Sequence, residues 1–325
     1  MVSVLRNGFM EGFLMKSWKK MLRGTAIAAG IGAAVFNFAP QDVYASEAGM
    51  EYMREVVAAN VDTKSVHVLQ DVNAACSYGT GKMTVDCKCT AEPMVVGGTL
   101  HLQGSLKEGN IGGEKDVPFY IEQAGKEVTL YFQWGEQWKK LVAPMTVEDL
   151  EKIKNEAIKE SASMEGIKDV DIVSDSPVKR TLSVTLDGQK IKDVFLDCMK
   201  KEKSKDLKNV LDADTQAMIG NVLFDAFDGL TYTETVDKAT KAVVASKMDL
   251  TGPVQKIANA VFEKYSDKMP IEQKVMAITL IPTLSLKLDG QYDYQGEAEA
   301  IVIPAEARNA VDITPKKEEV VPSAK

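Results

Sequence analysis

The stretch LTYTETVDKATKAVVASKMDLTG, residues 230–252, carries the clearest fold signal in the sequence. Apolar and polar residues alternate on both sides of the charged turn DKAT, as in two paired antiparallel strands. The second strand stops where Thr251 is placed to cap a helix and Pro253 lies near its first position. One side of that helix is apolar, with Val254, Ile257, Ala258, Val261, Phe262 and Tyr265. The stretch therefore predicts a sheet on which a helix lays its apolar face.

Two kinds of segment recur along the rest of the chain, and their periods separate them. Alternating segments predict strands; the main ones are SVHVLQDV (65–72), KMTVDCKC (82–89), TLHLQGSL (99–106), VPFYIEQ (117–123), EVTLYFQW (127–134), TLSVTLDG (181–188), TLSLKLDGQYDY (283–294) and EAIVIP (299–304). Apolar stripes at helical spacing predict helices near residues 50–57, 146–158, 191–199 and 218–227.

These segments predict the α+β class. One-sided strands joined by short turns such as QAGKE and WGEQW are typical of antiparallel sheets. We expect a curved antiparallel sheet, an incomplete barrel, with helices covering its apolar face. Because no linker rich in Gly, Pro or Ser divides the chain, residues 46–312 are predicted to form a single domain. The alternative is a division into two domains near Pro144.

The first 45 residues are interpreted as a signal peptide. A basic stretch ending at Arg23 precedes the apolar run 24–39, and Val43 and Ala45 occupy the small-residue positions of a cleavage site. The run is shorter than the roughly 20 residues that a membrane-spanning helix needs, although a retained anchor is the alternative. No lipobox cysteine follows the run. We therefore expect a soluble protein, exported to the periplasm or cell envelope, and not a stable transmembrane protein.

The charge of the chain argues against a nucleic-acid partner. It contains 39 Lys and Arg against 47 Asp and Glu, a formal net charge of −8, and no basic patch interleaved with aromatic residues is present. The C-terminal residues 313–325 are charged, contain two prolines and are predicted to be a disordered tail.

Motifs for catalysis are absent from the sequence. It has two histidines, His67 and His101, and lacks HExxH, GxSxG, Walker and dinucleotide-binding patterns. Both histidines lie in predicted strands, where a solvated side chain is the simpler interpretation. We expect no enzymatic activity, no cofactor and no metal site. A hydrolase is retained as a remaining class, which activity screening on esters and peptides would test.

Four cysteines, an even number in a chain with an export signal, are compatible with disulfides: Cys76, Cys87, Cys89 and Cys198. A bridge from Cys76 to Cys87 or Cys89 is one candidate, and Cys198 would reach the remaining thiol if its helix lies under the sheet. Buried free thiols are an equally weighted alternative. A zinc site that uses both thiols of CKC is the least favoured alternative, because its spacing differs from the common C-x₂₋₄-C pairs.

Two groups of apolar residues are candidates for a ligand site. Trp134 and Trp138 flank the WGEQW turn, and Ile257, Val261 and Phe262 lie on the apolar stripe of the helix at 251–265. If the apolar face of the sheet is larger than its helices can fill, that face would enclose an apolar ligand. The alternative is that these residues belong to an ordinary core and a hairpin tip.

Residues 229–311 resemble the LolA/LppX-like group of bacterial envelope proteins. That group has a strand, a DKxT turn, a second strand that ends near Asp-Leu, and a last strand that runs into an IPxxA close. The matching residues here are Asp237, Lys238, Thr240, Asp249, Leu250, Ile303, Pro304 and Ala307. The resemblance implies an incomplete antiparallel barrel, closed by helices over a cavity that carries a lipid or lipoprotein acyl chains. No binding residue is transferred by it.

The sequence as a whole predicts an exported envelope protein that binds a lipid or another hydrophobic ligand in a cavity between sheet and helices. An envelope protein is a further candidate partner. The alternative is a structural or protein-interaction module with a filled core. The volume of the cavity distinguishes the two.

Overall fold

The computed structural model describes residues 47–60, 65–91, 94–106, 113–144, 166–201, 213–294 and 300–314. Its strands are β1 (Ser65–Cys76), β2 (Gly79–Ala91), β3 (Met94–Leu106), β4 (Gly113–Ala124), β5 (Glu127–Trp134), β6 (Gln137–Pro144), β7 (Ile167–Asp175), β8 (Lys179–Leu186), β9 (Thr231–Asp237), β10 (Val243–Asp249), β11 (Ser285–Asp293) and β12 (Val311–Asp312). Its helices are α2 (Glu47–Asn60), α4 (Gly188–Lys201), α6 (Ala213–Phe227), α7 (Thr251–Tyr265), α8 (Ile271–Leu280) and α9 (Ala305–Arg308), with short 3₁₀ turns η1 (Ser266–Lys268) and η2 (Ile281–Thr283).

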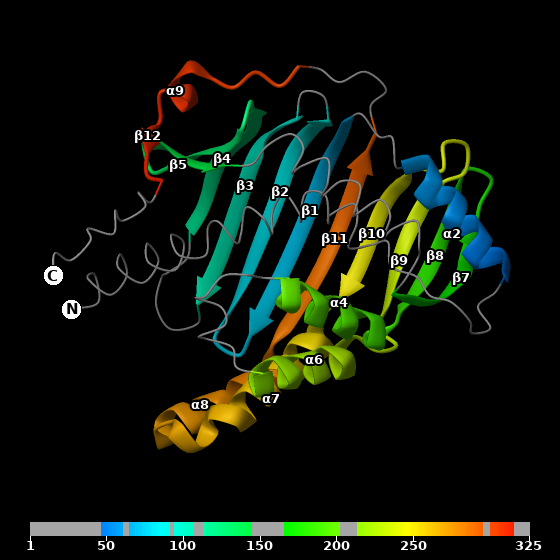
Figure 1. Ribbon diagram of the computed structural model, residues 1–325, viewed down its shortest axis with the longest axis vertical. Coiled ribbons are helices and arrows are strands. Elements are labelled where there is room, and N and C mark those ends of the chain that lie inside the picture. Colours follow the sequence, from blue (N-terminus) through cyan, green and yellow to red (C-terminus); the bar gives the residue numbers. More distant parts are fainter. Residues whose placement is uncertain are drawn as a thin grey trace, which may run out of the picture.

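All strands of the described residues belong to one twisted sheet (Figure 1). Their order is β12-β6-β5-β4-β3-β2-β1-β11-β10-β9-β8-β7, and every neighbouring pair is antiparallel except β12 and β6. The two ends of this order do not pair, so the sheet is open. The predicted α+β class, with a curved antiparallel sheet and helices, is confirmed.

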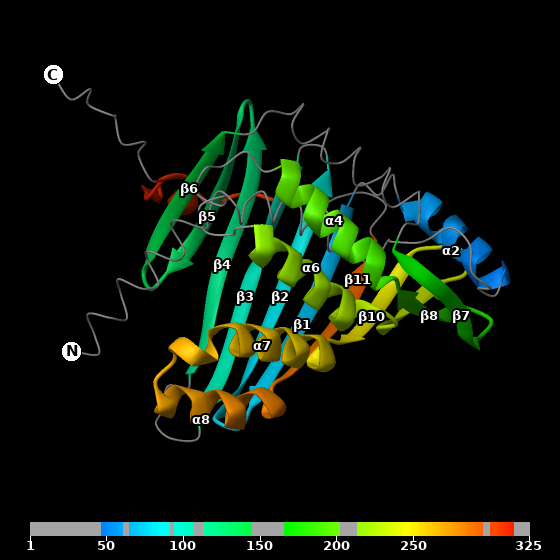
Figure 2. The ribbon, with the colours of Figure 1, turned by 60° about the horizontal axis from the view of Figure 1, so that its bottom comes forward.

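The strand register gives the sheet two distinct faces, because directly paired residues point to the same side. We call inner the face that carries these apolar side chains: Leu182, Tyr232, Met248, Leu288, Val68, Val85, Leu100, Phe119 and Leu130. Ile191 of α4 and Phe227 of α6 pack on the inner face. Figure 2 shows α4, α6, α7 and α8 as a layer in front of the central strands.

Helix α2 covers the inner face at the β7–β10 end of the sheet. Its residues Met50, Tyr52, Met53 and Val56 are buried in one cluster with side chains of β7, β8, β9 and β10. The predicted N-terminal helix is therefore confirmed. Its apolar stripe completes a core that the strands alone would leave open.

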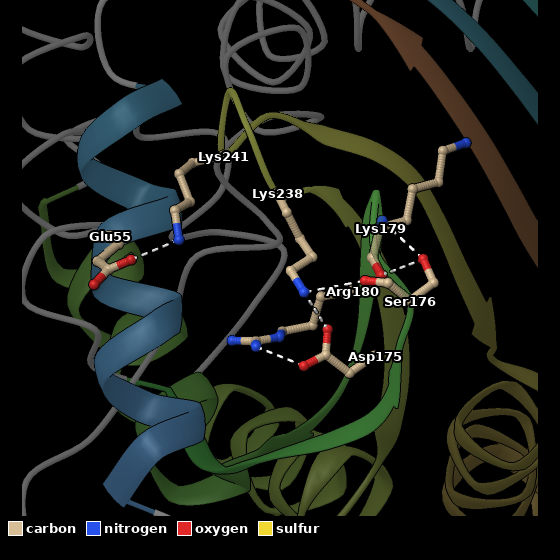
Figure 3. A network of polar contacts seen from close by, with 7 residues as sticks. All are labelled: Glu55, Asp175, Ser176, Lys179, Arg180, Lys238 and Lys241. Carbon is tan, nitrogen blue, oxygen red and sulfur yellow. Dashed lines mark hydrogen bonds and ion pairs between the residues drawn. The ribbon is translucent and has the colours of Figure 1, made fainter.

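A network of charged groups fastens α2 to the neighbouring turns (Figure 3). Lys241 Nζ lies 2.7 Å from Glu55 Oε2 of α2. The centroid of the Tyr52 ring is 4.0 Å from Lys241 Nζ and 4.2 Å from Arg180 Cζ. Asp175 receives hydrogen bonds of 2.7 Å from Arg180 and from Lys238. These two cations hold the pKa of the exposed Asp175 carboxyl down to about 2.

The hairpin predicted at residues 230–252 is confirmed as β9 and β10, with the DKAT turn between them. The Asp237 carboxylate accepts hydrogen bonds from the backbone N–H groups of Ala239 and Thr240 and from the Thr240 hydroxyl, which closes the turn. At the following residue, Lys241, φ is +60°. The lysine therefore adopts the left-handed backbone conformation that reverses the chain.

Helix α7 begins one residue earlier than the capping prediction required. Thr251 is the first helical residue and Leu250 occupies the N-cap position, where no side chain forms a cap hydrogen bond. The Thr251 hydroxyl instead lies 3.2 Å from the Ser285 hydroxyl and accepts a hydrogen bond from Leu286 N–H. The prediction that Thr251 caps the helix is therefore wrong, because its side chain anchors α7 to β11.

The strand predicted at EAIVIP is also wrong for the residues that the structure describes. Residues 300–304 form no ladder and lead into α9. Ile301 and Ile303 pack instead on the outer face, against Val95, Tyr120 and Tyr131. Pro304 has no N–H to donate, which is unfavourable within a ladder.

Three sequence predictions lie outside the described residues: the signal peptide at 1–45, the helix at 146–158 and the tail beyond Thr314. The first two residues of the predicted tail, however, are placed. Ile313 N–H donates to the Lys140 carbonyl at 3.0 Å, and Thr314 Oγ1 accepts from Val142 N–H at 2.8 Å. No helix in the described part of the chain is both long and apolar enough to span a membrane.

Candidate functional site

The centre of the inner face carries apolar side chains that belong to neither of the two buried clusters beside it. One cluster joins α2 to β7–β10, and the other lies on β5 and β6 around Val128 and Leu141. Between them are half-buried residues of β1–β4, which we call the inner band: Val68, Val72, Met83, Val85, Leu100, Leu102 and Phe119. Apolar side chains at the centre of a large sheet are normally buried. The inner band is thus an apolar surface that the described residues leave incompletely covered.

The helical layer meets the sheet mainly through α7 and β11. Gln255 Nε2 donates to the Leu284 carbonyl at 2.8 Å and to the Pro282 carbonyl at 3.1 Å. Pro253 is the one buried residue within α7. Helix α7 is therefore attached at its N-terminal end, near the start of β11.

The three ligand-site candidates on α7 are incompletely buried. Ile257 and Phe262 are half-buried, and Val261 is exposed. The apolar stripe that the sequence predicted is present, but it does not form a tightly packed core with the sheet. The assignment of these residues to a ligand site stays a prediction.

A row of polar residues crosses the inner face beside the inner band. The register aligns Glu234 of β9 with Ser246 of β10, Ser246 with Gly290 of β11, and Gly290 with Gln70 of β1. Tyr292 reaches back to this row, with its hydroxyl 2.9 Å from the Ser246 hydroxyl and 3.5 Å from Gln70 Oε1. We call these five residues the polar row.

Gly290 makes room for the side chains of the polar row. A Cβ atom at this position would lie 2.5 Å from the Tyr292 hydroxyl oxygen, 2.7 Å from Gln70 Oε1 and 2.9 Å from Ser246 Oγ. Such contacts are too short for any side chain to fit without displacing the three polar groups. The glycine therefore permits the polar groups of three strands to meet.

Glu234 is the most unusual member of the polar row, since only 1% of it is exposed. Its Oε2 atom has no hydrogen-bond partner, while the Tyr232 side chain forms a hydrogen bond with the carboxyl group. Burial raises the pKa of Glu234 from 4.5 to about 8, against the opposing effect of the Tyr232 hydrogen bond. The carboxyl group is thus mainly protonated at neutral pH, so it presents an O–H donor on the inner face.

The two tryptophans of the WGEQW turn lie on opposite faces of the sheet. Trp134 pairs with Gln137 and shares the inner face with Phe132, with Lys115 Nζ 3.5 Å from its ring centroid. Trp138 points to the outer face, where its ring centroid lies 5.8 Å from that of Tyr120 and the two rings are tilted by 36°. The structure therefore does not bring the two tryptophans together into one site.

The cysteine pairing across the first hairpin is wrong. Cys76 lies opposite Gly79 at the turn, while Cys87 and Cys89 lie opposite Val68 and Val66 near the other end of the hairpin. Cys76, Cys87 and Cys89 are free thiols. The side chain of Cys198 lies outside the described residues.

Cys87 and Cys89 share the inner face, as predicted from the spacing of CKC. Their mutual hydrogen bond, together with burial, raises the pKa of the Cys87 thiol above its usual range. The residues that the structure describes hold no cluster of three or more His, Cys, Asp or Glu suited to a metal ion. The zinc alternative therefore has no further ligand beside CKC in the described part of the chain.

Each histidine is paired with a carboxylate on a neighbouring strand. His67 Nε2 lies 2.7 Å from Asp86 Oδ1, and His101 Nδ1 lies 2.7 Å from Asp116 Oδ1. All four side chains are partly or largely exposed on the outer face. They form cross-strand hydrogen bonds typical of a solvated sheet surface.

The sequence contained a signal for the polar row that composition alone did not reveal. In TYTETVD, Glu234 has the same parity as the buried Tyr232 and Val236. A carboxylate at an apolar position of an alternating strand indicates a buried ionisable group. Ser246 and Gln70 become recognisable only when the pairing of the strands is known.

Comparison with known proteins gives a family without an assigned function. Residues 50–312 match the family model described as "Family of unknown function (DUF6612)". No curated protein matches the chain.

Among the solved structures that match the chain are two mycobacterial proteins. The lipoprotein LppX of Mycobacterium tuberculosis has a TM-score of 0.41 and 11% identity, with 79% of this chain and 100% of that chain covered. LprF from Mycobacterium bovis has a TM-score of 0.40 and 13% identity, with 81% of this chain and 99% of that chain covered.

Proposed function

For this chain, which belongs to the DUF6612 family of unknown function, we propose the binding of an apolar ligand, a lipid or acyl chain, against the inner band. The observation that carries the proposal is the group of half-buried apolar side chains between two clusters that are centred on buried residues. In a sheet of this size, such a surface is stabilised when an apolar molecule covers it. The helical layer, attached at one end of α7, is placed to cover that molecule.

Burial of the ligand is the proposed mechanism. Each CH₂ group removed from water contributes about 0.8 kcal/mol, so an acyl chain supplies several kcal/mol without a specific polar contact. The polar row borders the band, and its half-buried members Gln70 and Tyr292 offer amide and hydroxyl groups. We propose that these two side chains contact the polar end of the ligand, which an uncharged carbonyl or hydroxyl group fits best because the buried, neutral Glu234 beside them supplies no charge.

The proposal includes the cellular setting. Residues 1–45 would direct export, and residues 46–312 would form one soluble domain in the periplasm or cell envelope, without catalytic activity. Its support is the basic and apolar pattern of the leader. Cleavage after Ala45 is tested by N-terminal sequencing of the protein that cells export.

Native mass spectrometry tests the ligand. The chain from Ser46 is expressed in a bacterial periplasm, purified without detergent, and weighed before and after unfolding. We expect an additional mass that unfolding releases and that fragmentation identifies as a lipid. A protein that is free of ligand, and remains so after incubation with envelope lipids, would favour the alternative of a protein-interaction module.

Paired substitutions on one strand locate the ligand. Leu100 points to the inner face and Thr99 to the outer face, and both are half-buried. Leu100→Asp should lower lipid retention strongly, because it places a charge on the apolar surface, while Thr99→Asp should retain the lipid. Equal retention by the two folded variants would place the ligand elsewhere.

Two substitutions on α7 test whether this helix covers the ligand. Ile257→Asp and Phe262→Asp should each lower retention, because they place a carboxylate on the apolar stripe. Glu263→Gln, at an exposed position of the same helix, serves as the control. Unchanged retention in the folded aspartate variants would remove α7 from the site.

A further inference from the structure

Helix α8 exposes an apolar surface that the folded chain does not use. It contains no buried residue, and four of its apolar side chains are more than half exposed: Ile271 at 72%, Val275 at 59%, Met276 at 53% and Ile278 at 61%. Ile271, Val275 and Ile278 follow the i, i+4, i+7 spacing and form one stripe. A helix of ten residues gains little stability from its own hydrogen bonds in water. Contiguous exposed apolar groups indicate an interaction surface.

The exposed surface continues onto α7. Val261 and Tyr265, near the C-terminal end of that helix, are also exposed. The α7–α8 hairpin forms the outer end of the helical layer, at the side of the molecule away from α2, in both views (Figures 1 and 2). Exposed apolar helices at the edge of a protein can insert their apolar side chains into the interfacial region of a lipid bilayer.

The charge of the hairpin differs from that of the whole chain. Residues 251–283 carry the basic residues Lys256, Lys264, Lys268 and Lys274 and the acidic residues Glu263, Asp267 and Glu272. The segment is therefore slightly basic in a chain whose formal net charge is −8. An anionic bilayer repels most of this molecule, and the hairpin is a region that it does not repel.

We propose that the α7–α8 hairpin docks on the surface of a lipid bilayer, with the stripe Ile271, Val275 and Ile278 in the boundary between head groups and acyl chains. Lys264, Lys268 and Lys274 lie in the same hairpin and would supply the positive charge that attracts anionic head groups. This is the arrangement of an interfacial amphipathic helix. The proposal stands on the exposure of α8 and does not depend on a ligand at the inner band.

Vesicle co-sedimentation tests the docking. The chain from Ser46 is mixed with vesicles of phosphatidylcholine and phosphatidylglycerol, and the bound fraction is measured against lipid concentration. The test variant is the double substitution Val275→Asp and Ile278→Asp. The control is the double substitution Val173→Asp and Val178→Asp, whose positions, at β7 and the β7–β8 turn, are 56% and 62% exposed.

We expect the wild-type chain and the control to bind vesicles alike. The α8 variant should bind at least about a hundredfold more weakly, since each substitution removes an aliphatic side chain that the bilayer would bury and adds a charge. Circular dichroism establishes that both variants are folded. Equal vesicle binding by the two variants, or a folded wild-type chain that does not bind, would overturn the proposal. A wild-type dimer that the α8 variant converts to monomer, without vesicle binding, would identify a second copy of the chain as the occupant.

Discussion

The protonation of Glu234 predicts how the stability of this fold depends on pH. Replacing Glu234 with glutamine keeps the size of the side chain and the acceptor that faces the Tyr232 hydroxyl, but removes the ionisable group. In the wild-type protein the carboxyl group is almost completely buried, and its pKa is raised to about 8 from an ordinary value of 4.5. The difference between these two values sets the size of the effect.

A carboxyl group whose pKa is higher in the folded than in the unfolded state stabilises the fold most below the unfolded value. That contribution is fully present below pH 4.5 and is lost as the pH rises to about 8. Each pKa unit corresponds to about 1.4 kcal/mol. The whole change is therefore ~5 kcal/mol, and it accumulates at about 1.4 kcal/mol per pH unit between pH 5 and pH 8.

Urea unfolding at pH 5, 6, 7 and 8 measures this effect. We expect the free energy of unfolding of the wild-type protein, relative to that of Glu234→Gln, to fall by ~4 kcal/mol over this range. Because both proteins share all other titratable groups, their contributions cancel in the difference. Glu263→Gln, at an exposed position of α7, should follow the wild type at every pH. Parallel curves for wild type and Glu234→Gln would refute the assignment of a buried, neutral carboxyl group.

Two further predictions concern packing. Gly98→Ala should lower the free energy of unfolding by at least ~2 kcal/mol, because a Cβ atom there would overlap the Asp86 carbonyl oxygen and lie 2.5 Å from the Cys87 Cβ atom. Gly81→Ala should change it by less than ~0.5 kcal/mol, because a Cβ atom there would lie 4.0 Å from the Gln103 carbonyl oxygen. Equal effects of the two substitutions in urea unfolding would contradict the close approach of β2 and β3 at Gly98. Met53→Ala, at a fully buried position of α2, should lower the free energy of unfolding by about 3 kcal/mol. Met276→Ala, on the exposed surface of α8, should lower it by less than ~0.5 kcal/mol. A Met53 variant as stable as wild type in urea unfolding would show that α2 does not complete the core.

Local structure was largely predictable from the sequence, because the two periods of the apolar pattern differ so clearly. The alternation in residues 230–249 and the stripe in residues 251–265 predicted a hairpin and a helix that the structure contains. Thr251 shows the limit of local signals. Its hydroxyl has a cross-element partner in Ser285, and this tertiary contact replaces the cap that the local sequence suggests.

Features that depend on strand pairing were not predictable from the sequence. Trp134 and Trp138 are four residues apart, which would place them on the same face of one continuous strand, but the turn between them pairs Trp134 with Gln137 and sends Trp138 to the other face. Similarly, Cys76 and Cys87 belong to consecutive strands but to different ends of the hairpin. The polar row depends on three such pairings at once, so only its buried glutamate had a local signal.

The position of β11 has a consequence for how the chain folds. This strand is inserted between β1 and β10, where Val68 pairs with Tyr292 and Ser246 with Gly290. Without β11, strands β1–β6 and β7–β10 would have no pairing to each other, and β1 and β10 would each be an unpaired edge. Contacts between residues so far apart in sequence form slowly, because a long loop must close first. The joining of these two groups of strands by β11 is therefore expected to limit the rate of folding, and the polar row comes into existence in that same step.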